Sequence, residues 1–283
     1  MAKPQRIGIA IVTYNNSEED LNRLLKSVEL TVAQAKDANL LDETVLLVRD
    51  NGKKSNIALE SMRVVYDSQR ENVGYPSGMQ SLYQIGFEDY GLDAIVSANP
   101  DGCFHYRCLE WLLQVWKLHP KDIIEAAQFP EEHPKAYNPK TRETDWASGC
   151  CMLLSKFLYG KTGGLDTHFF LYVEDVDLSW RVRLAGHRIR FVPEAHYGHF
   201  VLNRKPNPFA VQCMYESGRY FAYKWRDKKF QKTCEENLVK EGFYKSRRQL
   251  PKLKSPRINA VASLRAIKNF STGFHFSKAR WGL

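Results

Sequence analysis

The sequence of 283 residues lacks any uninterrupted apolar run long enough to cross a bilayer, which takes about 20 residues in a helix. Its first residues pass from a short polar lead into a strand-like segment, without the apolar stretch of a signal peptide. The six cysteines form no C-x-x-C pair and no zinc-type spacing, which excludes the common zinc and dithiol motifs. We therefore expect a cytoplasmic protein with reduced, mostly buried thiols.

Acidic residues are absent from the C-terminal segment, Gly242 to Leu283, which carries ten lysines and arginines. The rest of the chain has 31 basic and 32 acidic residues, so the net charge of +9 belongs to this segment. A basic tail on a neutral body argues against nucleic acid as the partner. Aromatic residues are interleaved with the cations, as is typical of segments that lie peripherally on an anionic membrane, here the inner face of the cell membrane. A solvated tail or a partner-binding arm explains the same pattern.

Short apolar segments rich in β-branched residues alternate with helical patterns through the first hundred residues. The expected strands cover Arg6 to Thr13, Thr44 to Val48, Met62 to Tyr66 and Ala94 to Ser97. Ser17 can cap the first helix. This alternation predicts an α/β fold, with a mostly parallel central sheet flanked by helices. Ligands bind beyond the carboxyl ends of such strands, where the loops with Asn16, Asp50 and Asp101 fall.

The second half of the chain is less regular. Strands are expected at Ile123 to Phe129 and Cys150 to Leu154, and a long helix at Pro208 to Trp225. Between them, the acidic residues Glu174, Asp175 and Asp177 begin a helix that Gly186 ends, and a strand from Ile189 to Val192 stops at Pro193. This helix-strand unit returns Asp175 and His199 to one end of the sheet.

We expect one α/β domain over residues 1–228, followed by a basic, helical extension over residues 229–283. Within the domain, residues 1–102 form a first half and residues 103–228 a second half. The extension contains one helical pattern of its own, from Asn259 to Asn269.

Several polar motifs, taken in their order along the chain, resemble those of glycosyltransferase family two. They are Thr13-Tyr14-Asn15-Asn16, Asp50-Asn51-Gly52, Asn72-Val73-Gly74 with Gly78, Asn99-Pro100-Asp101, Trp146 to Gly149, and Tyr172 to Leu178. The resemblance covers roughly residues 6 to 225 and is to the branch with rhamnosyltransferases and galactofuranosyltransferases. It implies a GT-A fold and an inverting, metal-dependent transferase. Residues 1–228 would then be the catalytic domain, with residues 1–102 as its nucleotide-sugar-binding half and residues 103–228 as its acceptor and catalytic half.

The resemblance implies a nucleotide-sugar site built from the loops of the first half. Asp50 would accept hydrogen bonds from the base, while Thr13, Tyr14 and Asn15 hold base and ribose. The remaining residues of this site are Asn72, Gly74, Gly78, Asn99 and Asp101. Each has a simpler explanation, since aspartates favour turns and glycines permit tight loops.

A divalent cation would neutralise the diphosphate that leaves with the nucleotide, and oxygen ligands suit Mg²⁺ or Mn²⁺. The resemblance assigns the metal to Asp101 and His199, with His196 as a competitor. Many relatives present two carboxylates as D-x-D, whereas this chain has Asn99-Pro100-Asp101. One carboxylate holds a metal less firmly than two, so we expect the metal to bind together with the donor. A Pro-Asp-Gly turn is the alternative for Asp101.

Inversion needs a carboxylate that takes the proton of the acceptor hydroxyl. The resemblance gives this role to Asp175, with Glu174 orienting the acceptor or the base. Asp177 is left to cap the helix or to pair with Arg181. Trp146 and Gly149 are expected to contact the acceptor, although Trp146 also suits a place in the core.

The sequence thus predicts transfer of rhamnose or galactofuranose from a UDP or dTDP donor to a glycan or lipid-linked glycan, in cell-surface polysaccharide synthesis. A nucleotidyltransferase acting on sugar phosphates and a non-catalytic glycan-binding protein are the alternatives. The first usually has a Gly-rich phosphate loop with a basic residue after its first strand, where this chain has TYNNSEED. No G-x-G-x-x-G motif follows an early strand, which argues against an NAD oxidoreductase.

Overall fold

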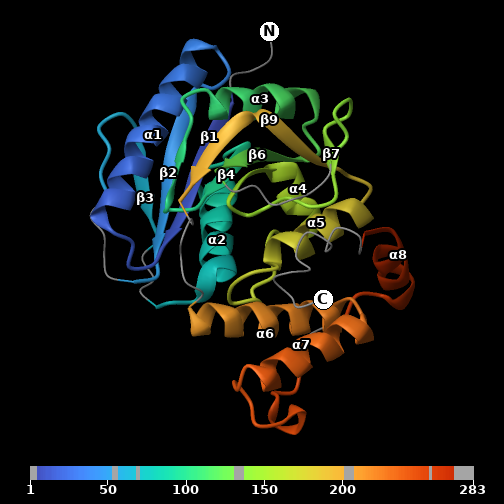
Figure 1. The fold of residues 1–283 in the computed structure, drawn as a ribbon. Coiled ribbons are helices and arrows are strands. Elements are labelled where there is room, and N and C mark those ends of the chain that lie inside the picture. Colours follow the sequence, from blue (N-terminus) through green and yellow to red (C-terminus); the bar gives the residue numbers. More distant parts are fainter. Residues whose placement is uncertain are drawn as a thin grey trace.

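A computed structural model describes residues 5–52, 57–67, 71–130, 137–200, 207–254 and 257–270. In these residues a nine-stranded sheet is covered by helices on both faces (Figure 1). The strands are β1 (Arg6–Thr13), β2 (Glu43–Asp50), β3 (Arg63–Tyr66), β4 (Ala94–Ala98), β5 (Gly102–Phe104), β6 (Ile123–Phe129), β7 (Glu143–Thr144), β8 (Cys151–Ser155) and β9 (Ile189–His199). The helices are α1 (Glu18–Asp37), α2 (Gly74–Gln84), α3 (Cys108–Leu118), α4 (Lys156–Thr162), α5 (Glu174–Leu184), α6 (Pro208–Lys224), α7 (Lys228–Lys240) and α8 (Ala260–Phe270).

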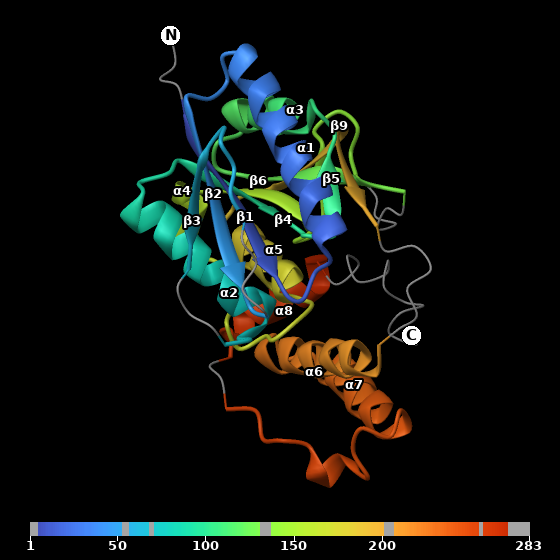
Figure 2. The ribbon, with the colours of Figure 1, turned by 90° about the vertical axis from the view of Figure 1, so that its left-hand side faces the viewer.

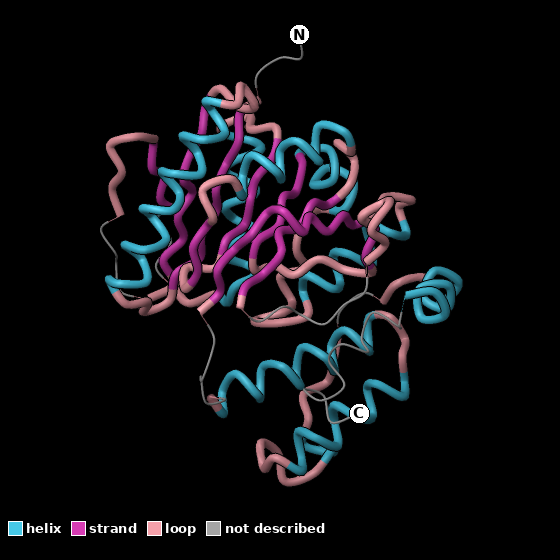
Figure 3. Tube along the Cα trace, turned by 45° about the horizontal axis from the view of Figure 1, so that its top comes forward, coloured by secondary structure: helices cyan, strands magenta, loops and turns pink. Residues whose placement is uncertain are grey.

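The strand order β3-β2-β1-β4-β8-β6-β9-β5 joins two halves of the sheet, with β7 paired to β9. In the first half β3, β2, β1 and β4 are all parallel, as predicted, and Thr13 lies opposite Asp50 where β1 and β2 end. β8 is antiparallel to both β4 and β6, and β9 runs parallel to β6. The carboxyl ends of the parallel strands therefore open at one edge, which Figure 3 shows above the helices α6 and α7.

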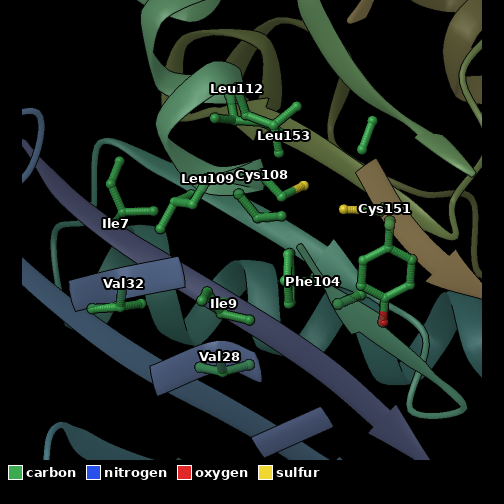
Figure 4. Packing of buried hydrophobic residues seen from close by; sticks show 14 of the residues in the cluster. Ile7, Ile9, Val28, Val32, Phe104, Cys108, Leu109, Leu112, Cys151 and Leu153 are labelled. Atoms are coloured by element: carbon green, nitrogen blue, oxygen red, sulfur yellow. The ribbon is translucent and has the colours of Figure 1, made fainter. Parts of the chain in front are cut away.

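Helices α1 and α3 pack on one face of the sheet. Ser17 begins α1 by accepting a hydrogen bond from the amide of Asp20, as predicted. Apolar side chains at helical spacing, including Val28 and Val32, then lie on Ile9 of β1 and form a closed core with α3 (Figure 4). Because all of these side chains are buried, this face is held mainly by the hydrophobic effect.

Helices α2, α4 and α5 cover the opposite face, where a second cluster joins residues of β1, β2 and β8. A third cluster lies beside the sheet, between α5 and α6. Its centre is Trp180, whose ring lies 5.0 Å from that of Trp225 and 4.8 Å from that of Phe221. The C-terminal extension contributes Phe230 and Ala266 to the same cluster, so α7 and α8 pack directly on the rest of the protein.

The predicted end of β9 is wrong. The strand does not stop at Pro193 but continues to His199, and its pairing with β6 shifts between Ala126 and Ala127. A proline cannot donate to a sheet ladder, yet a register shift of this kind accommodates one within a strand. This continuation is what carries His199 to the edge of the sheet.

The described cysteines are all free thiols, and all except Cys103 are buried, in agreement with the sequence. No helix in the described part of the chain combines the length and apolar character needed to span a membrane.

Candidate active site

The loops that follow β1 and β2 lie directly against one another. The amide of Asn51 donates to the carbonyl of Thr13 at 2.8 Å, and a Cβ on Gly52 would come within 2.6 Å of the Asn15 side-chain oxygen. The carboxylate of Asp50 accepts the Gly52 amide at 2.9 Å, and the Tyr14 side chain is 57% exposed above this junction. Tyr14, Asn15 and Asp50 therefore meet at this junction, whereas Thr13, the fourth residue predicted there, is buried at 1% exposure.

A buried arginine that the sequence analysis missed fixes these loops from beneath. Arg49 has no exposed surface, and its guanidinium donates to the side chain of Asn51 at 3.0 Å and of Asp67 at 2.7 Å. It also donates to the carbonyl of Glu71 at 2.9 Å. The planar guanidinium of Arg49 thus links three segments by hydrogen bonds, namely those after β2, after β3 and before α2. The sequence feature that could have indicated this role is an arginine inside the otherwise apolar strand β2.

Gly74 joins the donor half of the site to the catalytic half. Its amide donates to the Asn72 side chain at 3.1 Å, and its carbonyl accepts from Asn51 at 3.0 Å. Its φ of +80° favours glycine, and a Cβ there would collide with the carbonyl of Phe170. Gly78 has a packing role, because its missing side chain lets α2 lie close to Val12. The structure thus explains both glycines without a ligand.

The two predicted metal ligands lie together. Gly102, next to Asp101, pairs with His199 between β5 and β9, and His199 Nε2 lies 3.4 Å from the Asp101 carboxylate. The Asn99 amide nitrogen is also 3.4 Å from His199 Nε2. The competitor His196 is exposed, three residues earlier on the strand.

This pair fits one divalent cation. Two neighbouring ligands of an octahedral ion, each about 2.1 Å from it, lie about 3 Å apart, and one oxygen with one imidazole suits Mn²⁺. The described residues contain no cluster of three His, Cys, Asp or Glu side chains that could hold a metal. A cation at Asp101 and His199 would therefore need further ligands from the donor or from water.

Asp175 is held in place by the backbone. Its two carboxylate oxygens accept the amides of Gly149 and Val176 at 2.9 and 2.8 Å. The carbonyl of Cys150, the next residue after Gly149, accepts the amide of Asn99 at 2.9 Å. Residues 149–150 thus connect Asp175 to the Asn99-Pro100-Asp101 segment. Burial together with the charges of Asp101 and other carboxylates raises the pKa of the Cys150 thiol well above its usual value.

Glu174 differs from Asp175 in its environment. Its side chain is buried, and burial together with the charges of Asp175 and Asp177 raises the pKa of Glu174 well above its usual value. Tyr172 and Val173, which lead into α5, both have positive φ values of about 70°. A β-branched residue rarely adopts this conformation, so the start of α5 is strained where its acidic residues begin.

The Asp177 side chain lies in the third hydrophobic cluster, where its partners are on α5 and at the end of α6. It is fully buried and accepts from Arg181 at 2.8 Å, which confirms the predicted pair. It also accepts from Lys224 at 2.8 Å and from the Trp225 indole at 2.9 Å. Asp177 therefore anchors α5 on α6. The structure also places Trp146 in this cluster, 2% exposed, which agrees with the core alternative.

Lys224 also pairs with Asp166, at 2.6 Å. Burial alone would raise the pKa of Asp166, but Lys224 and hydrogen bonds from His168 hold that pKa well below its usual value. A carboxyl with a depressed folded-state pKa stabilises the protein above its unfolded pKa, near 4, and loses this effect as pH falls below it. We expect the free energy of unfolding to fall more steeply between pH 6 and pH 3 in the wild type than in Asp166→Asn. Urea titrations at each pH measure this, and equal slopes would contradict it.

Comparison with known proteins supports the resemblance seen in the motifs. No protein-family model matches the chain. A 61-residue segment is 41% identical to N-acetylglucosaminyl-diphospho-decaprenol L-rhamnosyltransferase of Mycobacterium tuberculosis (strain ATCC 25618 / H37Rv), covering 22% of this chain and 20% of that protein. A 56-residue segment is 39% identical to rhamnosyltransferase WbbL of Escherichia coli (strain K12), covering 20% and 21%. The matches thus span about a fifth of these curated relatives.

Solved structures share the fold over most of the chain. The crystal structure of GalNAc-T7 with UDP, GalNAc and Mn²⁺ superposes with a TM-score of 0.64 at 13% identity, covering 97% of this chain and 56% of that one. The crystal structure of S. aureus TarS gives 0.53 at 14% identity, covering 86% and 44%. The chain has the predicted GT-A glycosyltransferase fold, and its local sequence similarity is to the rhamnosyltransferase-like branch.

Proposed function

We propose that this protein is an inverting glycosyltransferase of cell-surface polysaccharide synthesis. It moves a sugar, rhamnose or galactofuranose, from a nucleoside diphosphate to a glycan or lipid-linked glycan. The observation that carries this proposal is the connection of Asp175 to the Asp101–His199 pair through residues 149–150. A carboxylate base beside a cation site is the equipment that sugar transfer from a diphosphate requires.

The donor nucleotide is proposed to lie on the junction of the loops after β1 and β2. Asp50 would accept from the base, and Tyr14 and Asn15 would contact base and ribose. The buried Thr13 would act indirectly, by fixing the loop through its carbonyl bond to the Asn51 amide. The exposed ring of Tyr14 and the packing of Asn15 against Gly52 support this placement. Asn72 and Gly74 would contribute through the backbone that they shape, while Gly78 would act indirectly through the packing of α2.

Asp101 and His199 would hold Mg²⁺ or Mn²⁺, with Asn99 beside them. The bound cation would neutralise the negative charge of the leaving diphosphate. Both ligands have side chains at least 86% buried, so their attraction for a cation is only weakly screened by water.

Asp175 would remove the proton of the acceptor hydroxyl as its oxygen attacks the anomeric carbon. The bond from that carbon to the diphosphate oxygen breaks on the opposite face, which inverts the configuration. The amides of Gly149 and Val176 hold the carboxylate in place and would place Gly149 beside the acceptor. Glu174, whose raised pKa favours its protonated form, would orient the base or the acceptor without accepting the proton.

Calorimetric titration with UDP and with dTDP, each with and without Mn²⁺, tests this proposal. We expect one of the two nucleotides to bind, and to bind more tightly with Mn²⁺, because Asp101 and His199 would hold a cation whose charge favours the diphosphate. A protein that binds glycans without catalysis would show no metal-dependent affinity for either nucleotide. That result would contradict the proposed function.

His199→Ala is expected to weaken Mn²⁺ binding in the presence of the nucleotide by on the order of 10-fold to 100-fold, because the site has few protein ligands. Electron paramagnetic resonance of free Mn²⁺ measures this without an activity assay. The matched control is His196→Ala, which removes an exposed imidazole from the same strand. Equal Mn²⁺ affinity in the two variants would remove His199 from the metal site.

A further inference from the structure

We propose that α8 and the segment before it form a docking surface for an anionic phospholipid membrane. This membrane-docking surface has two parts, which Figures 1 and 2 show apart from one another. The first is the segment after α7, with the exposed cations Lys245, Arg248, Lys252 and Lys254, and the second is the exposed face of α8, with Val261, Leu264 and Arg265. It combines exposed cations with two exposed aliphatic side chains. None of these residues takes part in the proposed transfer reaction.

The charge of this surface has one sign. From Gly242 onward the chain contains no acidic residue. Among the described cations of the extension, Arg247 pairs with Glu235 at 2.5 Å and Arg257 stacks over the Tyr223 ring at 4.0 Å. These two arginines attach the extension to the body of the protein. The five exposed cations point into solvent instead, where they can attract the headgroups of acidic lipids.

The two faces of α8 differ. Ser263 and Ala266 are buried, and Ala266 belongs to the third hydrophobic cluster. Val261 and Leu264 lie one helical turn apart on the other face, and are 77% and 70% exposed. Arg265 is exposed next to them. A helix anchored on one side that presents aliphatic side chains and a cation on the other can insert at the boundary between headgroups and acyl chains.

Helix α8 packs on the helix that carries the proposed base. α8 contacts α5, the helix that begins at Glu174 and Asp175. Figure 1 shows α8 beside the end of α5 that leads into β9, on the opposite side of the molecule from β1 and β2. A bilayer bound at α8 would therefore lie beside α5. In that orientation α5 would lead from the bilayer to Asp175 in its first turn, which a lipid-linked acceptor would have to reach, and that consequence alone rests on the proposed function.

Co-sedimentation of the full chain with lipid vesicles tests the docking surface without any sugar donor. We expect binding to vesicles of phosphatidylglycerol and phosphatidylcholine, little binding to pure phosphatidylcholine, and release at 1 M salt. The variant Lys245→Gln/Lys252→Gln/Lys254→Gln should lower the partition coefficient on the order of 100-fold, since each cation near an anionic surface contributes about 5-fold. The matched control Lys26→Gln/Lys36→Gln/Lys140→Gln removes three exposed lysines elsewhere and should bind as the wild type does.

The apolar part is tested by Val261→Asp/Leu264→Asp, which should lower vesicle binding at least 10-fold. Its control is Leu30→Asp/Leu118→Asp, where the side chains are 62% and 76% exposed on α1 and α3. If another part of this chain or a second copy covered α8, the first double variant would lower Tm or dissociate an oligomer and leave vesicle binding unchanged. Either that result, or equal binding to both kinds of vesicle, would overturn the proposal. So would tight binding to RNA with no binding to vesicles.

Discussion

Asp175→Asn is expected to lower kcat for sugar transfer by about 10²-fold to 10⁴-fold, the range that a general base contributes. The variant keeps a side-chain oxygen for the Gly149 amide but cannot take a proton from the acceptor. Donor affinity should change little, because Asp175 faces the acceptor side of the proposed site. Single-turnover rates and a nucleotide titration of the same sample separate the two quantities.

Glu174→Gln is the matched control, one residue away on the same helix. Because the pKa of Glu174 is raised, the neutral glutamine resembles the form already present, and kcat should fall far less than in Asp175→Asn. If Asp175→Asn kept most of its activity while Glu174→Gln lost it, the roles of the two carboxyl groups would be reversed. If both variants kept their activity, neither would be the base.

Asp177→Asn is expected to lower the free energy of unfolding by about 3–5 kcal/mol. Removing this charge leaves Lys224 and Arg181 facing a neutral amide inside the third cluster, and breaking a buried ion pair costs about this much. Urea denaturation followed by circular dichroism measures the change. Asp89→Asn, an exposed carboxylate at the end of the helical turn after α2, is the control and should stay within about 0.5 kcal/mol of the wild type. A loss below 1 kcal/mol in Asp177→Asn would contradict the anchoring of α5 by this network.

The first half of the fold could be predicted closely, because its strands are apolar segments bounded by polar loops. The expected strand Ala94 to Ser97 corresponds to β4, and the motif residues after the strands do meet at one edge of the sheet. The helix expected from Asn259 to Asn269 is also present, as α8. In each case the spacing of apolar residues indicates the type of element, and the polar residues that follow indicate where it ends.

Features that depend on distant partners could not be predicted. Helix α3 has no side-chain cap at its start, and a short apolar segment does not by itself distinguish a helix from a buried strand. The course of β9 past Pro193 depends on its pairing with β6. The local sequence does not indicate the partners of Arg49 and Lys224. Arg49 pairs with Asp67, and Lys224 pairs with Asp166 and Asp177, all of which are distant along the chain.

A panel of sugar donors tests the proposed transfer reaction most directly. The protein is incubated with Mn²⁺ and a set of UDP- and dTDP-sugars that includes rhamnose and galactofuranose donors, and nucleoside diphosphate release is measured. We predict release of UDP or dTDP from one or a few of these donors. His199→Ala should lose this activity, and His196→Ala should keep it. No turnover of any donor, or release of pyrophosphate from a nucleoside triphosphate with a sugar phosphate, would contradict this prediction.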